Sequence, residues 1–209
     1  HAMARTSGPT RSLLAAALLL AGGAHAQTYT KTETITYSDN HAAWVLGQVA
    51  TVTDASTGAV QSSTSYDPAT ALPLSVSAFG KLQATMTYNA DGTLATVKDG
   101  LDHTTTLSNW KRGIPQTIQY ADTTSKTAVV NDNGWITSVT DENGPGYTTT
   151  YGYDAMGRRT STKLANGSQT LNAFNAAGQR ISQTDATGHT SQFAYDPMGR
   201  LASVQDALG

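Results

Sequence analysis

The chain has 209 residues, with 13 Lys and Arg against 15 Asp and Glu, and it contains no cysteine. This near-neutral balance without a basic run gives no indication of nucleic-acid binding, and the lack of cysteine excludes disulfides and thiolate metal sites. Thr, Ser, Gly, Asn and Asp are abundant while charged residues make up only 13%, a composition typical of a β-rich exported protein.

Residues 1–26 have the pattern of a secretory signal peptide. Two arginines precede an apolar run over residues 13–24, and Ala24-His25-Ala26 is a small-x-small cleavage site. The run is too short to span a bilayer, which needs roughly 20 helical residues. We therefore expect no transmembrane span, a mature chain that begins near Gln27, and a secreted, cell-surface or periplasmic location. The alternative is a buried N-terminal helix. Residues 1–2 are interpreted as a cloning scar or upstream read-through.

Residues 27–65 are less regular and are predicted to form an N-terminal β cap or an atypical first repeat. β-Branched and aromatic residues indicate one strand over residues 29–37 and another over residues 44–49. The first repeat of a stacked protein differs from the inner ones because it must close the stack against water.

From residue 66 to residue 209 a glycine recurs about every 21 residues. The spacings are 21, 21, 23, 21 and 21 between Gly92, Gly113, Gly134, Gly157, Gly178 and Gly199. Five of these follow an Asp or Asn by three residues, whereas Gly113 has Asn109 four residues ahead. A further unit at residues 66–68 has no glycine near Ala71, where the period would place it. A period of this length indicates structural repeats.

The residues around each glycine are those of tight turns. Asp or Asn at the first position and Gly at the fourth are typical of a type I turn, and Pro68 and Pro197 fit its second position. Asn166-Gly167 predicts a type I′ hairpin turn, in which both central residues have positive φ. Two turns per period leave room for two strands of about six residues, so each repeat is predicted to be one β-hairpin. The second turn of each repeat falls at Asp99-Gly100, Asp141–Gly144, Asn166-Gly167, Asp185–Gly188 and Asp206–Gly209.

The strand segments support an all-β fold. Tyr151-Gly152-Tyr153 and Phe193-Ala194-Tyr195 place aromatic rings two residues apart, on one face of a strand. Alternation is imperfect after the glycines, which either a β-bulge or a sheet contacted on both faces would explain. No segment of the mature chain has a helical stripe. The leading prediction is tandem hairpins in an extended, curling antiparallel sheet; the runner-up is a β-propeller, because two hairpins make one four-stranded blade.

A hexapeptide recurs at residues 153–158, 174–179 and 195–200, and we interpret it as a structural turn motif rather than as a functional site. Asp154 and Asp196 could be imagined as a glycosidase pair, but Asn175 replaces them in the copy between, which a turn tolerates and a catalytic acid does not. No nucleophile, zinc or dinucleotide motif is present, so we predict no catalytic residue and no enzyme activity. The structural repeat motif is predicted to consist of Tyr153, Asp154, Gly157, Arg158, Phe174, Asn175, Gly178, Tyr195, Asp196, Gly199 and Arg200.

Other chemistry-bearing residues are given structural interpretations. His103 and His189 precede Thr-rich strands and are read as exposed turn residues without metal partners. Arg158 and Arg200 are expected to bridge to neighbouring carboxylates, and Trp135 to pack in a strand rather than to stack on sugars. Calcium is not favoured because the nonapeptide repeats of calcium-binding solenoids are absent. We therefore predict no cofactor and no metal.

Two stretches carry a family resemblance. Residues 185–201 and residues 141–159 resemble the YD repeat of bacterial Rhs proteins, which teneurins and toxin-complex subunits also carry; Arg159 stands where Leu is usual. The resemblance covers most of residues 66–209. It implies that hairpins add edge to edge into a sheet that forms a hollow β-shell. In several members the shell encloses a C-terminal toxin domain, and others act in contact-dependent competition or adhesion, sometimes through glycans.

The resemblance predicts a non-enzymatic scaffold of an exported Rhs protein. Its expected partner is its own downstream C-terminal domain, because we read residues 1–209 as the N-terminal fragment of a larger protein with too few repeats to close a shell. The alternative is a cell-surface module for carbohydrate binding or adhesion, with surface glycans or neighbouring cells as partners. Neither hypothesis involves nucleic acid.

Overall fold

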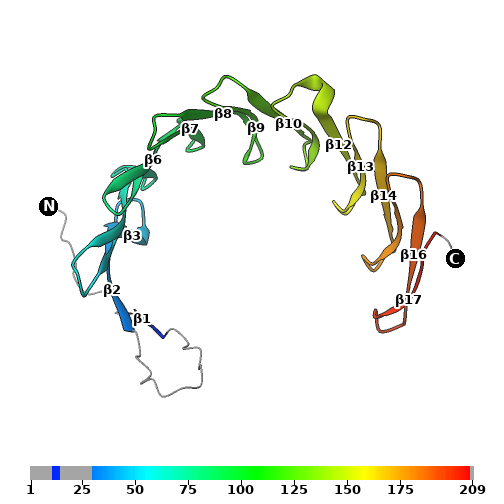
Figure 1. Cartoon of the computed structure of the whole chain (residues 1–209), viewed down its shortest axis with the longest axis horizontal. Coiled ribbons are helices and arrows are strands. Elements are labelled where there is room, and N and C mark those ends of the chain that lie inside the picture. Colours follow the sequence, from blue (N-terminus) through cyan, green and yellow to red (C-terminus); the bar gives the residue numbers. More distant parts are fainter. Residues whose placement is uncertain (1–10, 15–29, 208–209) are drawn as a thin grey trace, which may run out of the picture. The chain divides into compact units, whose positions relative to one another are not determined.

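The computed structural model describes residues 11–14 and 30–207, and it contains two compact units, residues 1–104 and residues 105–209. Each unit consists of β-hairpins that follow one another in chain order (Figure 1). The first unit holds β1 (Arg11–Leu14), β2 (Thr30–Asn40), β3 (Val45–Asp54), β4 (Val60–Tyr66), β5 (Pro73–Ala78), β6 (Lys81–Tyr88) and β7 (Leu94–Asp99).

The second unit holds the regular repeats and one short 3-10 helix, η1 (Pro145–Tyr147). Its strands are β8 (Thr104–Lys111), β9 (Ile114–Gln119), β10 (Ser125–Val130), β11 (Ile136–Thr140), β12 (Thr148–Tyr153), β13 (Arg159–Lys163), β14 (Gln169–Phe174), β15 (Arg180–Thr184), β16 (Thr190–Tyr195) and β17 (Leu201–Gln205).

Every strand pairs antiparallel with its neighbours in sequence within its unit. In the second unit the pairing is unbroken from β8 to β17. This confirms the predicted antiparallel sheet of tandem hairpins. The runner-up β-propeller is wrong, because its blades would divide this ladder into separate four-stranded sheets.

Five of the six periodic glycines, all except Gly113, stand in three-residue hairpin loops. In the loop at Asp154 the Gly157 N–H donates to the Asp154 carbonyl at 3.0 Å, and the Asp154 N–H donates to the Arg158 carbonyl at 3.1 Å. Gly157 has a φ of +79°. A type I turn followed by a left-handed residue gives this pattern, and glycine adopts that conformation without the steric cost of a side chain.

The predicted turn type at Asn166-Gly167 is wrong, although the hairpin itself is present. Gly167 has a φ of +86°, but Asn166 is not among the residues with positive φ. The turn begins at Leu164, whose carbonyl accepts the Gly167 N–H at 3.0 Å. Positive φ at two successive residues, the mark of a type I′ turn, occurs instead at Phe79-Gly80 and Arg112-Gly113.

The imperfect alternation after the glycines results from β-bulges. Gly152 pairs with Ser161 and Tyr153 with Arg159, so Thr160 is an extra residue in β13. The same shift occurs between β14 and β15 and between β16 and β17. A bulge reverses the phase of alternation and increases the local twist, so contact on both sheet faces is not needed to explain the pattern.

The first unit departs from the sequence pattern at Ala71 and at the start of β3. Ala71, which stands where the period lacks a glycine, itself takes a φ of +61°, and its N–H donates to the Asp67 carbonyl at 2.8 Å. The second predicted strand begins at Val45 rather than Trp44, whose φ is +55° and whose exposed fraction is 88%. The predicted boundary after residue 65 stays a prediction.

Little of the described chain is buried. Ala71 and Val130 are the only buried hydrophobic residues of the described part. Hydroxyl pairs join neighbouring strands, as between Thr140 and Thr148 at 2.8 Å and between Thr184 and Thr190 at 2.8 Å. Stability therefore comes from strand pairing and cross-strand side-chain contacts rather than from one central core.

The predicted signal peptide lies outside the described residues except at β1, of which only the backbone is described. Among residues 11–14 and 30–207, no helix is long and apolar enough to cross a membrane.

Replacing Gly157 by Ala is expected to destabilise the sheet more than the same change at Gly167. Both residues have positive φ, which costs alanine about 1–2 kcal/mol. A Cβ atom at Gly157 would in addition lie 2.9 Å from the Trp135 ring, whereas nothing lies within 4 Å at Gly167. We expect G157A to lose roughly 1 kcal/mol beyond G167A, measured from urea unfolding midpoints by circular dichroism. Equal losses would show that the Trp135 contact is unimportant.

Candidate functional site

The repeated motif builds a closed hydrogen-bond network around each turn. The Asp154 Oδ1 atom accepts the N–H of Met156 at 2.9 Å and of Arg158 at 3.0 Å. The Arg158 Nε atom donates to Asp154 Oδ2 at 2.6 Å. Asp196 and Arg200 repeat this arrangement, with the Arg200 Nε atom 2.7 Å from Asp196 Oδ2. Each arginine therefore forms an ion pair with the aspartate of its own turn, as predicted.

The middle copy of the motif keeps this geometry without charge. The Asn175 Oδ1 atom accepts the Gln179 N–H at 3.0 Å, and the Asn175 Nδ2 atom donates to Gln179 Oε1 at 2.7 Å. An amide pair thus replaces the carboxylate and the guanidinium. The network needs an acceptor and a donor at these positions, but it does not need a titratable group.

The two motif carboxylates are electrostatically unsuited to act as general acids. Hydrogen bonds from the Arg200 backbone and guanidinium hold the pKa of Asp196 below its usual value. Burial pushes the pKa of Asp154 upward, but hydrogen bonds from Arg158 and Met156 outweigh it, so this pKa is also lowered. A glycosidase acid needs a raised pKa. Both groups instead act as ionised hydrogen-bond acceptors.

We call the six periodic glycines the motif glycines. The residue after three of them, Gly134, Gly157 and Gly178, reaches the next turn along the chain, an interaction that we call the forward contact. The Arg158 Nη1 atom donates to the Asn175 carbonyl at 3.0 Å. The Gln179 Nε2 atom donates to the Gly199 carbonyl at 3.1 Å. The Trp135 ring lies against Gly157, where a Cβ atom would be 2.9 Å from it. Three chemically different side chains therefore perform the same task.

Two of the forward contacts also cover the aromatic ring of the next repeat. The Trp135 and Tyr153 ring centroids are 5.4 Å apart, with the rings tilted by 38°. The Arg158 guanidinium lies 4.9 Å from the centroid of the Phe174 ring. Such aromatic and cation–π pairs stabilise beyond the area that they bury, so they reinforce the seam between repeats.

Tyrosine hydroxyls make a second contact, in the opposite direction. The Tyr153 hydroxyl donates to the Ile136 carbonyl at 2.7 Å, and the Tyr195 hydroxyl donates to the Arg180 carbonyl at 2.9 Å. We call this interaction the backward contact. Tyr66 and Tyr88 make equivalent hydrogen bonds in the first unit. Phe174 has no hydroxyl and therefore lacks this bond.

The structure places the eleven predicted motif residues at these turns and seams. Tyr153, Phe174 and Tyr195 end strands, and the Asx, glycine and arginine positions form the loops that follow. Sequence reasoning missed Trp135 and Gln179 as members of the seam. Both stand directly after a motif glycine, as Arg158 does, so the signal was the position in the repeat rather than the residue type.

The histidines lie in turns, as predicted. The His103 Nδ1 atom is 3.0 Å from Asp99 Oδ2, and the His189 Nδ1 atom is 2.6 Å from the Thr187 hydroxyl. Their side chains are 63% and 62% exposed. Over residues 11–14 and 30–207 no three His, Cys, Asp or Glu side chains are placed to hold a metal ion.

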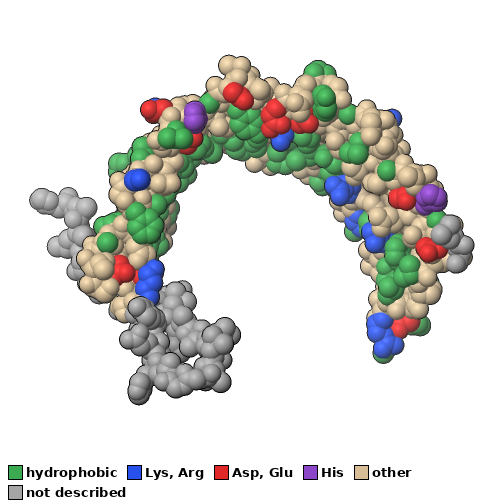
Figure 2. Space-filling model, in the orientation of Figure 1, with side chains coloured by type: hydrophobic (Ala, Val, Ile, Leu, Met, Phe, Trp, Pro, Cys, Tyr) green, Lys and Arg blue, Asp and Glu red, His purple; other side chains and the backbone are tan. Residues whose placement is uncertain are grey.

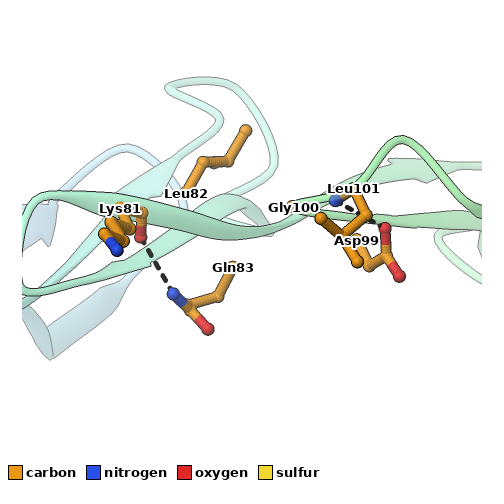
Figure 3. Close-up of a pocket in the computed structure, with 6 residues that line it drawn as sticks. All are labelled: Lys81, Leu82, Gln83, Asp99, Gly100 and Leu101. Atoms are coloured by element: carbon orange, nitrogen blue, oxygen red, sulfur yellow. Dashed lines mark hydrogen bonds between the residues drawn. The ribbon is translucent and has the colours of Figure 1, made fainter.

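A cavity of about 550 Å³ lies between the β5–β6 turn and the β7–β8 turn. Figure 3 shows its lining, in which the Gln83 Nε2 atom donates to the Lys81 carbonyl at 3.2 Å and the Leu101 N–H donates to Asp99 at 2.8 Å. The backbone of Gly100 approaches the Leu82 carbonyl so closely that a Cβ atom would clash with it. The one carboxylate in the lining of this cavity, that of Asp99, accepts hydrogen bonds within its own turn, so the lining offers no acid–base pair.

Replacing Phe174 by Tyr is expected to add the missing backward contact. The acceptors of Tyr153 and Tyr195 stand two residues after a motif glycine, so the equivalent acceptor is the Arg159 carbonyl. One hydrogen bond contributes about 1 kcal/mol, and we expect F174Y to raise the urea unfolding midpoint accordingly.

The Y153F variant is the reverse change and should lower the midpoint by a similar amount. If Y153F lowers the midpoint while F174Y leaves it unchanged, the proposed equivalence of the two positions is wrong.

The fold and two segments of the sequence are similar to known proteins. Residues 130–169 and 174–209 match the RHS Repeat family. No curated protein matches the chain. Three of the similar solved structures are TcdB2–TccC3–TEV, the Tc holotoxin pore of Photorhabdus luminescens, and TcdB2–TccC3 without its hypervariable C-terminal region.

These structures share the fold at low sequence identity. Their TM-scores are 0.61, 0.51 and 0.50, and their identities are 17%, 14% and 13%, respectively. The alignments cover 85% of this chain in each case, but only 10%, 13% and 9% of the other chains. This chain therefore spans about a tenth of the length of the structures that it matches. Residues 130–169 and 174–209 of this chain are therefore RHS repeats, and its antiparallel hairpins resemble the RHS β-shell of the Tc toxins in fold.

Proposed function

We propose that this chain is a non-enzymatic scaffold of an exported protein and contributes a section of wall to a shell around a C-terminal domain encoded downstream. The observation that carries this proposal is the paired forward and backward contact between successive hairpins. The contact depends on repeat position, since Trp135, Arg158 and Gln179 all make it. A seam that accepts different side chains is suited to extending a sheet by many similar units.

The shallow burial of the described residues also favours a wall. Only Ala71 and Val130 are buried hydrophobic residues there, so the sheet forms a thin layer rather than a globule with an enclosed active site. The motif carboxylates are engaged in their own turns. These polar groups of the repeats therefore stabilise the fold.

The related structures are consistent with this role. One is part of a Tc holotoxin, and another is TcdB2–TccC3 without its hypervariable C-terminal region. By analogy, we propose that the repeats of this chain precede a C-terminal region that they carry or enclose.

The arrangement of exposed aromatic residues favours the scaffold over stacking on neutral sugars. Trp44 and Phe79 lie in turns and Tyr147 in η1, with exposed fractions of 88%, 76% and 57%. They are far apart in sequence and belong to different hairpins, so they do not make a row along one strand.

Export through the predicted signal peptide belongs to the same proposal. When the natural gene is expressed, N-terminal sequencing of the protein from the periplasm or medium should give a start at Gln27. Retention of the first 26 residues in the cytoplasm would contradict export.

In the complete product of the gene, the region after residue 209 is expected to resist limited proteolysis while the wall is intact. Replacing Trp135 by Ala removes a forward contact and should speed cleavage of that region several-fold, because a seam between repeats opens. Trp44 is the matched control, since its side chain is 88% exposed in a turn and W44A should leave cleavage unchanged. Cleavage as fast as that of the isolated region would overturn the shell proposal.

A further inference from the structure

One edge of the sheet in the first unit is covered by a strand of the predicted signal peptide. β1 pairs antiparallel with β2 and places Arg11 opposite Glu33. β3 occupies the other edge of β2. Cleavage before Gln27, which belongs to the function proposed above, removes β1 and leaves this edge of β2 open. The unpaired backbone groups of an edge strand invite pairing with another chain.

The register of β2 and β3 shows which backbone groups of β2 face the open edge. The Ala55 N–H donates to the Thr32 carbonyl at 2.9 Å, so the backbone of Thr32 faces β3. Glu33 is paired with Asp54, whose N–H donates at 2.9 Å into the turn that follows β3. The two residues of such a pair direct their backbone groups away from each other, and the direction alternates along a strand. The N–H and C=O groups of Lys31 and Glu33 therefore face the open edge.

This edge carries one positive and one negative charge, two residues apart. The Lys31 Nζ atom lies 2.6 Å from Glu33 Oε1, so both side chains lie on one face of the sheet. Figure 2 shows basic and acidic side chains together where Figure 1 labels β2. Asp54 is opposite Glu33 on β3, and like charges directly opposite each other are destabilising. A cation on the outer side of Glu33 is therefore favoured, and Arg11 has that position in β1.

A second copy of β2 supplies this cation when the two strands pair antiparallel about a two-fold axis at Thr32. Lys31 of each copy then lies opposite Glu33 of the other, which gives two opposite-charge pairs. Both residues direct their backbone groups to the open edge, so this register also forms the hydrogen-bonded pairs of an antiparallel ladder. An axis at Lys31 or at Glu33 would place identical charges opposite each other. Charge therefore selects one register.

The other face of β2 is compatible with the same register. There Thr32 lies opposite Thr32 of the second copy, at the two-fold axis. A hydroxyl pair of this kind already joins β2 to β3, where the Thr36 and Thr51 hydroxyl oxygens are 2.6 Å apart. Cross-strand threonine pairs contribute to the stability of a sheet. Both faces of the edge therefore favour the same pairing.

We propose that the mature chain, which begins at Gln27, forms a symmetric dimer through the edges of its two β2 strands, with Lys31 and Glu33 as the residues that select the partner. A second copy is favoured over an unrelated strand because the charges of the edge are complementary to themselves. The two-fold arrangement is closed, so it ends in a dimer rather than in a fibre. This inference rests on the proposed removal of residues 1–26, but it does not depend on the shell.

The test compares the mature chain with the complete chain by sedimentation velocity over a range of concentrations. Only one strand of each copy takes part, so we expect a weak, reversible dimer of the mature chain. The complete chain should stay monomeric, because β1 covers the edge. A mature chain produced directly, without its first 26 residues, separates this test from export, which N-terminal sequencing examines by itself.

Charge reversals identify the interface. K31E and E33K each turn two attractive pairs into repulsive ones and should weaken dimerisation about tenfold. The double variant K31E/E33K exchanges the two charges and should restore the dimer. A mixture of the two single variants should form a mixed dimer, because one copy then carries two acids at the edge and the other two lysines.

K98E is the matched control. Lys98 lies on β7 of the same unit, and its Nζ atom forms an exposed ion pair with Asp102 at 2.6 Å. K98E should leave dimerisation unchanged, and circular dichroism with urea midpoints should show that every variant is folded. The proposal is overturned if the mature chain is monomeric or unfolded, or if the complete chain dimerises as well. It is also overturned if folded K31E and E33K dimerise like the unaltered chain, if K98E weakens the dimer as they do, or if mixing them restores none.

Discussion

The structure depends on contacts between successive hairpins. An isolated hairpin is marginally stable at best in water, and the hairpins described here bury almost no side chain of their own. Each one is held instead by its neighbours: the residue after a motif glycine reaches forward to the next turn, and a tyrosine hydroxyl reaches back. The free energy of unfolding is then approximately the sum of contributions from similar interfaces. Disrupting one seam should therefore destabilise mainly the two hairpins that it joins.

The motif turn makes these contacts possible. Gly157 turns the chain with positive φ and exposes a bare backbone, against which Trp135 packs. The Asx residue closes the loop through its side-chain oxygen, and Asn175 does so as well as Asp154 or Asp196. Charge at this position is therefore optional for the geometry. This explains why the Asx position varies while its hydrogen bonds remain, and why its acids are poor candidates for catalysis.

Placing the carboxylates in turns leaves the strands of the second unit positively charged. Asp and Asn favour loops because of their turn-forming side chains, so the placement of the carboxylates in the turns needs no functional explanation. It does leave Arg159 and Arg180 stacked on rings without a carboxylate partner among the described residues.

The sequence by itself determined the hairpins, the position of their turns and the all-β class, because the preferences of Asp, Asn, Gly and β-branched residues act over a few neighbouring positions. It suggested a bulge without locating it at Thr160. The sequence predicted the wrong turn type at Asn166-Gly167, where pairing of the flanking strands selected a different turn. It also did not predict the type I′ turn at Phe79-Gly80, because Phe79 is not a residue that favours positive φ. The partners of Trp135, Arg158 and Gln179 were decided only by the tertiary structure. Each of these side chains acts on a turn about 20 residues away, and only the register of the intervening strands brings the two together.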